Sequence, residues 1–553
     1  MKTKYLAISV VLVFGLLAFM PKVEAVVPAP DGGYPGGNTA EGQSALLSLT
    51  SGGFNTAVGL FSLRTVTTGS FNTGIGAGTL LANTGNENTA TGAGALLSDT
   101  TGFNNTAAGA FALVFNTEGS LNTAVGDRTL FSNTTGSLNV AVGFQALSGN
   151  TTGSSNTANG DQALLSNTTG NSNTAMGDSA LLSNIIGDNN TAVGSGALLS
   201  NTADNNTAVG NAALNANTTG SFNTTTGAGA LLSNADGGSN TANGASALQS
   251  NTAGTSNTAT GASALFSNTN GNGNTANGTF ALQNSTTGGA NTASGVAALR
   301  FNIDGDFNTA SGFNSLQSNT HGSQNTASGN NSLENNTTGI QNTATGDDAL
   351  QNNTGGNENT ALGFKAGLNA TTGAGNVYIG SQVIGVAGES NHTYIRNINT
   401  TTVSGGGTDT VTVNLTTGLL GHLSSSRRYK EDIKSMDKAS EALYRLKPAT
   451  YRYKKEIDTT QSLDYGLIAE DVAQVDPNLA IRNGKGEIES VRYNAVNAML
   501  LSEFLKEHRK VEELETTMTR LTATVERQAA QIKKVSAQIE VGKPAPQIVV
   551  NAP

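Results

Sequence analysis

A block of seventeen residues repeats twenty-one times between Asn38 and Gly380, and this periodicity constrains the fold more than any other feature of the chain. Each copy starts with Asn, usually as Asn-Thr-Ala-x-Gly, and only the intervals that end at Asn88 and Asn206 are sixteen residues long. A fixed period near twenty residues is typical of a solenoid, in which each repeat packs only against its neighbours. The sequence therefore predicts a rod over residues 38–380.

Within the repeat, glycine holds the fifth position in every copy, and leucine holds the ninth in the first nineteen copies, until Gly367 ends the series. Short strands, glycine turns and corners of Asn and Thr favour a parallel β-solenoid, or β-roll, with one repeat per coil. Leucine would fill the core, and asparagine in register would form amide ladders. Stacks of short helices are the alternative, which this density of Gly, Asn and Thr disfavours.

The repeat is similar to the head repeats of trimeric autotransporter adhesins, whose S-V-A-I-G motif matches N-T-A-V-G at residues 55–59 and 122–126. The resemblance implies a left-handed β-roll with three chains side by side. The period here is longer than in that family, so the handedness of the coil stays open.

The rod's composition disfavours several functions. It has four basic residues, Arg64, Arg128, Arg300 and Lys365, which is too few for binding to phosphate backbones, so we expect no nucleic-acid partner. Its acidic residues form no paired stripe for glycoside cleavage, and its one histidine, His321, is more typical of a surface residue than of a catalyst. We expect no cofactor and no metal ion in this protein.

Residues 1–25 have the pattern of a secretory signal peptide: Lys2 and Lys4, an apolar run from Leu6 to Met20, and a small-residue cleavage pattern at Ala25. The apolar run is shorter than the roughly twenty residues of a bilayer span, and no later segment resembles one. We therefore expect a secreted or cell-surface protein with no membrane span in the mature chain. Because the chain has no cysteine, its stability must come from stacking and oligomerisation.

Beyond the repeats the sequence predicts a transitional β-rich stem at 381–423, a small α+β domain at 424–507, a coiled coil at 508–541 and a flexible tail at 542–553. In the domain, helices are expected over 438–446 and near Glu470, and strands from Tyr451 and over 487–493. A long helix should begin near Asn494. Apolar side chains spaced by sevens, interrupted at Gln528, indicate the coiled coil but not the number of its chains: Val511, Met518, Val525, Ile532 and Ile539, with Leu514, Leu521 and Val535 between them.

Three segments carry a second resemblance: residues 425–433 with Ser-Ser-Arg-Arg-Tyr-Lys, residues 465–472 with Gly-Leu-Ile-Ala-Glu-Asp, and the terminal helix. They resemble the peptidase S74 family, the intramolecular chaperone domain of endosialidases and phage tail spikes. That resemblance implies a trimer that guides folding of the fibre before it and then cuts itself off. It makes Ser425 the nucleophile, Lys430 the base and Arg428 the motif arginine, whereas Ser426 stands where the family has aspartate.

These features together predict a secreted homotrimeric fibre, adhesin-like, with a host-surface or glycan receptor as its outside partner and a self-cleaving serine endopeptidase as its chaperone. One alternative is a purely structural surface fibre that is not cut. Another is a ligand-binding solenoid that uses the threonines at the second repeat position to bind glycan or ice.

Overall fold

The computed structural model describes residues 34–401, 411–415, 420–422 and 424–542. The chain divides into two compact units, residues 1–401 and 402–553, which are described separately below. The expected signal peptide and all but the first residue of the expected tail lie outside the described residues. No helix in the described part of the chain is long and apolar enough to cross a membrane.

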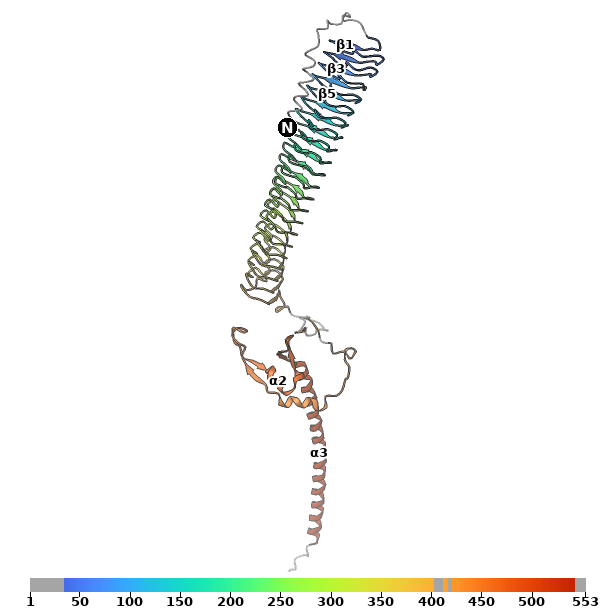
Figure 1. Ribbon diagram of the computed structural model, residues 1–553. Coiled ribbons are helices and arrows are strands. Elements are labelled where there is room, and N and C mark those ends of the chain that lie inside the picture. Colours follow the sequence, from blue (N-terminus) through green and yellow to red (C-terminus); the bar gives the residue numbers. More distant parts are fainter. Residues whose placement is uncertain (1–33, 402–410, 416–419, 423, 543–553) are drawn as a thin grey trace, which may run out of the picture. The chain divides into compact units, whose positions relative to one another are not determined.

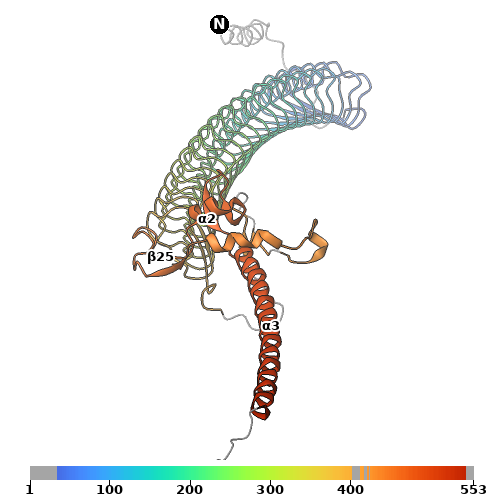
Figure 2. The same ribbon diagram turned by 90° about the horizontal axis from the view of Figure 1, so that it is seen from below.

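The first unit is a parallel β-solenoid, as the repeat predicts, and its coils stack into a curved rod (Figures 1 and 2). One 22-stranded sheet runs along it, and consecutive coils pair in register, for example Thr39 with Thr56 and Thr56 with Thr73. Its strands are β1 (Thr39–Glu41), β2 (Thr56–Val58), β3 (Thr73–Ile75), β4 (Thr89–Thr91), β5 (Thr106–Ala108), β6 (Thr123–Val125), β7 (Val140–Val142), β8 (Thr157–Asn159), β9 (Thr174–Met176), β10 (Thr191–Val193), β11 (Thr207–Val209), β12 (Thr224–Thr226), β13 (Thr241–Asn243), β14 (Thr258–Thr260), β15 (Thr275–Asn277), β16 (Thr292–Ser294), β17 (Thr309–Ser311), β18 (Thr326–Ser328), β19 (Thr343–Thr345), β20 (Thr360–Leu362), β21 (Val377–Ile379) and β22 (Thr393–Ile395).

The core of the rod is made of small and medium apolar side chains in continuous columns. The repeat's leucines are buried, and so are most of the alanines at the third and eighth positions. Leu214 is typical: it is fully buried but takes a left-handed backbone conformation, with φ of +54°. That conformation costs an L-residue about 1–2 kcal/mol, and burying a leucine contributes about 1.5–3 kcal/mol. Burial therefore holds each leucine in a turn that its propensity opposes.

Two asparagine ladders run through the interior beside this core. The backbone N–H and the side-chain Nδ2 of Asn139, at the first repeat position, both donate to Oδ1 of Asn122 in the previous coil, at 3.0 and 3.1 Å. At the twelfth position, Nδ2 of Asn150 donates to Oδ1 of Asn133 at 2.7 Å. Both Asn139 and Asn150 also donate to the carbonyl oxygen of Gly153 at 2.9 Å. The ladders satisfy buried polar groups that would each cost about 1–3 kcal/mol if unpaired.

The rod ends in a coil that departs from the repeat. Gly367 replaces the core leucine, and the side chain of Tyr378, fully buried, occupies the space, since a Cβ added to Gly367 would lie 2.7 Å from its ring. The Tyr378 and Tyr394 hydroxyls donate to the two carboxylate oxygens of Glu389, at 3.0 and 2.7 Å. Tyr394 belongs to β22, a strand beyond the last predicted repeat. These aromatic residues close the core at this end of the rod.

The second unit contains short antiparallel sheets and one long helix. Its elements are β23 (Thr412–Val413), β24 (Leu420–Gly421), the 3-10 helices η1 (Arg427–Tyr429), η2 (Asp437–Arg445) and η3 (Pro477–Leu479), β25 (Ala449–Tyr451), β26 (Asp464–Gly466), α2 (Ala469–Val475), β27 (Ala480–Arg482), β28 (Ile488–Val491) and α3 (Tyr493–Val541). The sequence predicted the β-rich stem, α2, β25, β28 and α3, and it predicted a helix over 438–446 that has 3-10 geometry here. It did not predict η1, η3, β26 or β27, the partner of β28.

Candidate functional site

Ser425 and Lys430 flank a single helical turn, η1. Ser426 caps this turn, because its side-chain oxygen accepts from the backbone N–H of Arg428 at 3.4 Å. The backbone N–H of Lys430 closes the turn by donating to the carbonyl oxygen of Arg427 at 3.2 Å. The five-residue spacing between the expected nucleophile and base therefore includes a turn, which an extended strand would not provide.

In the single chain the expected dyad is not assembled. Ser425 and Lys430 are both exposed, and within the described residues no hydrogen bond joins them. A lysine must lose its proton before it can activate a serine, and burial or nearby positive charge favours the neutral amine. Arg427 and Arg428 supply charge next to Lys430 in the sequence, but this chain alone leaves the lysine in solvent.

Ser426, at the position of the family's aspartate, contacts the motif arginine as well as capping the turn. The Nε atom of Arg428 donates to the Ser426 hydroxyl oxygen at 3.3 Å, and the guanidinium lies 5.5 Å from the centre of the Tyr429 ring. Serine and aspartate are both good N-caps, so the replacement preserves the local turn. It removes one negative charge beside Arg428.

The second motif, around Gly466 to Asp471, contributes to the small apolar core of the second unit. It contributes the end of β26 and the first turn of α2, whose Val472 packs with Ala442, Leu479, Val491 and Met499. The backbone N–H of Leu467, in this motif, donates to the hydroxyl oxygen of Tyr493, at the start of α3, at 3.1 Å. The motif therefore has a structural role within a single chain.

A serine–lysine contact lies instead between η2 and α3, at residues that the sequence did not single out. Lys506 Nζ donates to the buried Ser440 hydroxyl at 2.9 Å and to the Glu503 carboxylate at 2.6 Å. The hydrogen bond from Lys506 holds the pKa of Glu503 at about 2. An ammonium group held in an ion pair cannot accept a proton from serine, so this network anchors η2 on α3. The i,i+3 spacing of Glu503 and Lys506 indicates their ion pair, but not the contact of Lys506 with Ser440.

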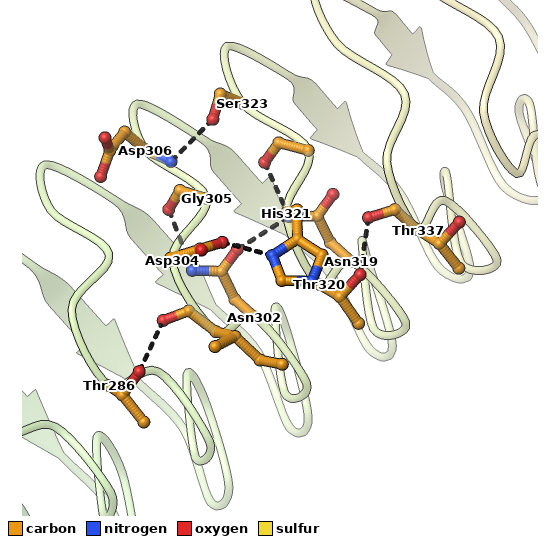
Figure 3. Close-up of polar contacts among 12 residues, drawn as sticks. Thr286, Asn302, Asp304, Gly305, Asp306, Asn319, Thr320, His321, Ser323 and Thr337 are labelled. Carbon is orange, nitrogen blue, oxygen red and sulfur yellow. Dashed lines mark hydrogen bonds and ion pairs between the residues drawn. The ribbon is translucent and has the colours of Figure 1, made fainter.

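His321 in the rod belongs to an exposed corner (Figure 3). Its Nδ1 atom lies 2.6 Å from Oδ1 of Asp304 in the previous coil, and both side chains are about half exposed. The hydroxyl of the neighbouring Thr320 donates to the backbone carbonyl of Thr337 rather than to the histidine. No cluster of three or more metal-binding side chains occurs among the residues that the structure describes. This corner is an inter-coil contact between one imidazole and one carboxylate.

The long solenoid, together with a family match in the second unit, supports a tail-fibre-like structural protein. Residues 425–481 match the family model described as chaperone of endosialidase, peptidase S74. The match begins at Ser425 and extends through η1, α2 and most of β27, which confirms the resemblance for this segment, 57 of the 553 residues. Searches of curated proteins and of solved structures found no match.

Proposed function

We propose that this protein is an exported homotrimeric fibre whose C-terminal unit acts as an intramolecular chaperone and then cuts the chain beside Ser425. The observation that best supports this proposal is the exposed apolar stripe on α3. In this 49-residue helix only Met499 and Glu503 are buried, whereas Leu514, Met518 and Ile532 are 66%, 71% and 66% exposed. Apolar residues repeated every seven positions on a helix are covered by other helices.

The chaperone role follows from the architecture of the rod and from the family match. A solenoid coil contacts only its neighbours, so an isolated coil has little core and must be held while the next one forms. The matched segment begins at Ser425, 30 residues after the last strand of the solenoid ends at Ile395. The family resemblance selects three chains, because the heptads alone leave the number of helices open.

Cleavage requires that assembly bury the exposed dyad. In a trimer, neighbouring copies would remove solvent from the η1 turn and favour the neutral lysine that Ser425 needs. The export proposal rests on the sequence of residues 1–25 alone. We also propose a host-surface or glycan receptor as the outside partner, because the protein is fibre-like.

Mass spectrometry and light scattering of the purified full-length product test the proposal together. We expect removal of residues 1–25, a cut beside Ser425 and a mass of three chains. Ser425→Ala and Lys430→Ala should each leave the chain whole and trimeric, and the matched control Ser424→Ala should still be cut. Cleavage of Ser425→Ala at the same bond would show that the nucleophile is wrong.

A second candidate is the same fibre with a chaperone that stays attached, and Ser426 is the observation that favours it. If the folded trimer is never cut, Ser426→Asp restores the family motif and should restore cutting, since the turn already accepts an N-cap at this position. An uncut Ser426→Asp trimer would support the purely structural alternative.

A further inference from the structure

On the outer face of the 22-stranded sheet, the first residues of successive strands form a row, the strand file, in which the residue type is nearly constant. In each strand the middle residue points into the core and the first and third point outward. The first residue is threonine in every strand except β7 and β21, which have Val140 and Val377. Because an outward side chain is not selected by the core, core packing does not explain this constancy.

The hydroxyls of this file differ from those of the other threonine file in the rod. At the thirteenth repeat position, the hydroxyl of Thr117 donates to the carbonyl oxygen of Thr134 at 3.0 Å, and Thr134 donates likewise to Thr151. Thr123 and Thr275, in the strand file, have no side-chain hydrogen bond among the described residues, and the same holds for the other threonines of that file. The strand file thus has hydroxyl donors and acceptors that no described group of the chain uses.

The third strand residue forms a second file beside the first. Several of its members are apolar and substantially exposed: Val58, Ile75, Val125, Val142, Met176, Val209, Leu362, Ile379 and Ile395. From Thr226 to Thr345 the file is polar and uncharged, made of Thr, Asn and Ser. Across both files Glu41 is the single charged side chain, whereas other sides of the coil carry charges such as Asp127, Asp304 and Lys365.

The first and third residues of the 22 strands together form the threonine face. We infer that this face is the surface on which copies of the rod pack side by side. The inference rests on the proposed trimer and names the part of the rod that the trimer uses. A partner that meets both files along the whole rod must share their spacing of about 4.8 Å per strand, and a second copy of this chain has that spacing by construction. Exposed Val, Ile and Met beside an uncharged file suit burial against such a copy.

The size of the face agrees with this occupant. Twenty-two strands at about 4.8 Å give a face about 100 Å long. With a width of about 10 Å, each copy offers on the order of 1,000 Å², which a trimer divides between two neighbours. Three copies would then bury on the order of 3,000 Å² in total, which is within the range of permanent assemblies. Hydroxyls buried there need partners, which the threonines and the polar segment of the opposing copy can provide.

The chain has no cysteine, so single cysteines can test the face in the full-length protein. Thr275→Cys places a thiol on the threonine face, and Thr287→Cys, the matched control, places one elsewhere on the same coil. Both threonines are exposed in the single chain. In the assembled protein we expect Thr275→Cys to label at least tenfold more slowly with a bulky maleimide than Thr287→Cys, and labelling to become equal after denaturation. Thr292→Cys, one coil along, should be protected as well.

The possible results separate this inference from the function on which it rests. A trimeric protein in which Thr275→Cys and Thr292→Cys label as fast as Thr287→Cys overturns the inference and leaves the trimer standing; the face would then be open to a ligand such as glycan or ice. A monomeric full-length protein would defeat the proposed trimer itself, and the inference with it. Protection of both face positions in a trimer supports the inference.

Discussion

At the scale of single residues, stacking of one coil on the next decides which side chains are tolerated. Gly227 has φ of +139°, and a Cβ added to it would lie 2.5 Å from the carbonyl oxygen of Gly244 in the next coil. Gly220 has no positive φ, yet its Cβ would lie 2.2 Å from the carbonyl oxygen of Gly237. One glycine is therefore required by both backbone conformation and close approach, and the other by close approach alone.

Gly227→Ala should destabilise the rod by several kcal/mol, because the methyl group meets fixed backbone and the φ angle disfavours any L-residue. The neighbouring Thr226 is exposed on a strand, so Thr226→Ala should change stability by less than about 1 kcal/mol. Thermal unfolding of the two variants measures the difference. Equal melting temperatures would mean that the coils can separate enough to accept a methyl group.

Asp99 is a carboxyl group in the buried asparagine ladder of the twelfth position. Asn116 Nδ2 donates to its Oδ1 atom at 2.7 Å, but its Oδ2 atom has no partner among the described residues. Burial raises the pKa of Asp99 from 3.8 to about 7, against the hydrogen bonds from Asn116 and Gly102. The folded rod therefore holds this proton more tightly than the unfolded chain does.

A raised pKa in the folded state contributes stability at low pH that is lost as the pH rises toward 7. Asp99→Asn removes this titration and supplies the missing amide donor. Its stability relative to the natural protein should rise by roughly 1.4 kcal/mol for each pH unit between about pH 4 and 7, then level off. Denaturant unfolding at pH 4, 5.5, 7 and 8.5 checks this. A difference that does not vary with pH would show that the carboxyl reaches water.

At the scale of the structural element, the final coil exchanges the positions of its large and small core residues. In the regular coils a leucine packs against the third residue of the following coil; Leu63, for example, lies 3.5 Å from a Cβ built on Gly74. In the terminal coils the small residue is Gly367 and the large one is Tyr378. The exchange keeps the core filled while it brings the tyrosine hydroxyl to Glu389.

Tyr378→Ala should cost about 3–5 kcal/mol by leaving a cavity, and Gly367→Leu should also destabilise because its side chain meets the tyrosine ring. The double variant restores the ordinary leucine and alanine, and the φ of +65° at Gly367 is close to that of the other core leucines. It should therefore recover much of the stability that either single change loses. A double-mutant cycle measures the coupling between the two positions. If the changes in the free energy of unfolding simply add, the two residues do not exchange roles as described.

The sequence predicted the strands, the buried leucines and the amide ladders, because each follows from a residue type repeated at a fixed spacing. It did not predict the positive φ of the leucines, since Ala-Leu-Leu-Ser favours a helix locally and only closure of the coil imposes the turn. Strand β22 was missed because its coil begins with His392 and has Arg396 in place of glycine, although His392 still donates its backbone N–H to Asn376 at 3.0 Å. Backbone pairing continues where the side-chain pattern stops.

The candidate site was predictable to a similar extent. The motif identifies Ser425, Lys430 and Arg428, but the geometry of the η1 turn between Ser425 and Lys430 depends on hydrogen bonds that the motif does not specify. The contact of Ser440 with Lys506 joins residues 66 positions apart, and no local pattern reports such a pair. The proposed chemistry needs several copies of the chain, and their association decides how the copies are arranged. The sequence of a single chain indicates this association only through the exposed apolar stripe on α3.

At the scale of the whole molecule, the proposed chaperone role makes folding of the rod depend on assembly of α3. Val525 and Ile532 are 57% and 66% exposed in the single chain and occupy the same heptad position. Changing both to Asp would place charges in the apolar seam of the coiled coil. The matched control, Ala523→Asp with Ala530→Asp, adds the same charge on the opposite side of the helix.

We expect the Val525→Asp, Ile532→Asp protein to lose its trimeric mass and to fail in rod folding, with weak β-sheet circular dichroism and rapid proteolysis between residues 38 and 380. The control should keep both the trimer and the rod, because its charges remain in solvent. The effect should depend on timing: a rod already folded with the natural helix should survive later proteolytic removal of α3, because each coil is then held by its neighbours. If the rod folds normally without a trimer, its coils assemble unaided, and the C-terminal unit has another purpose.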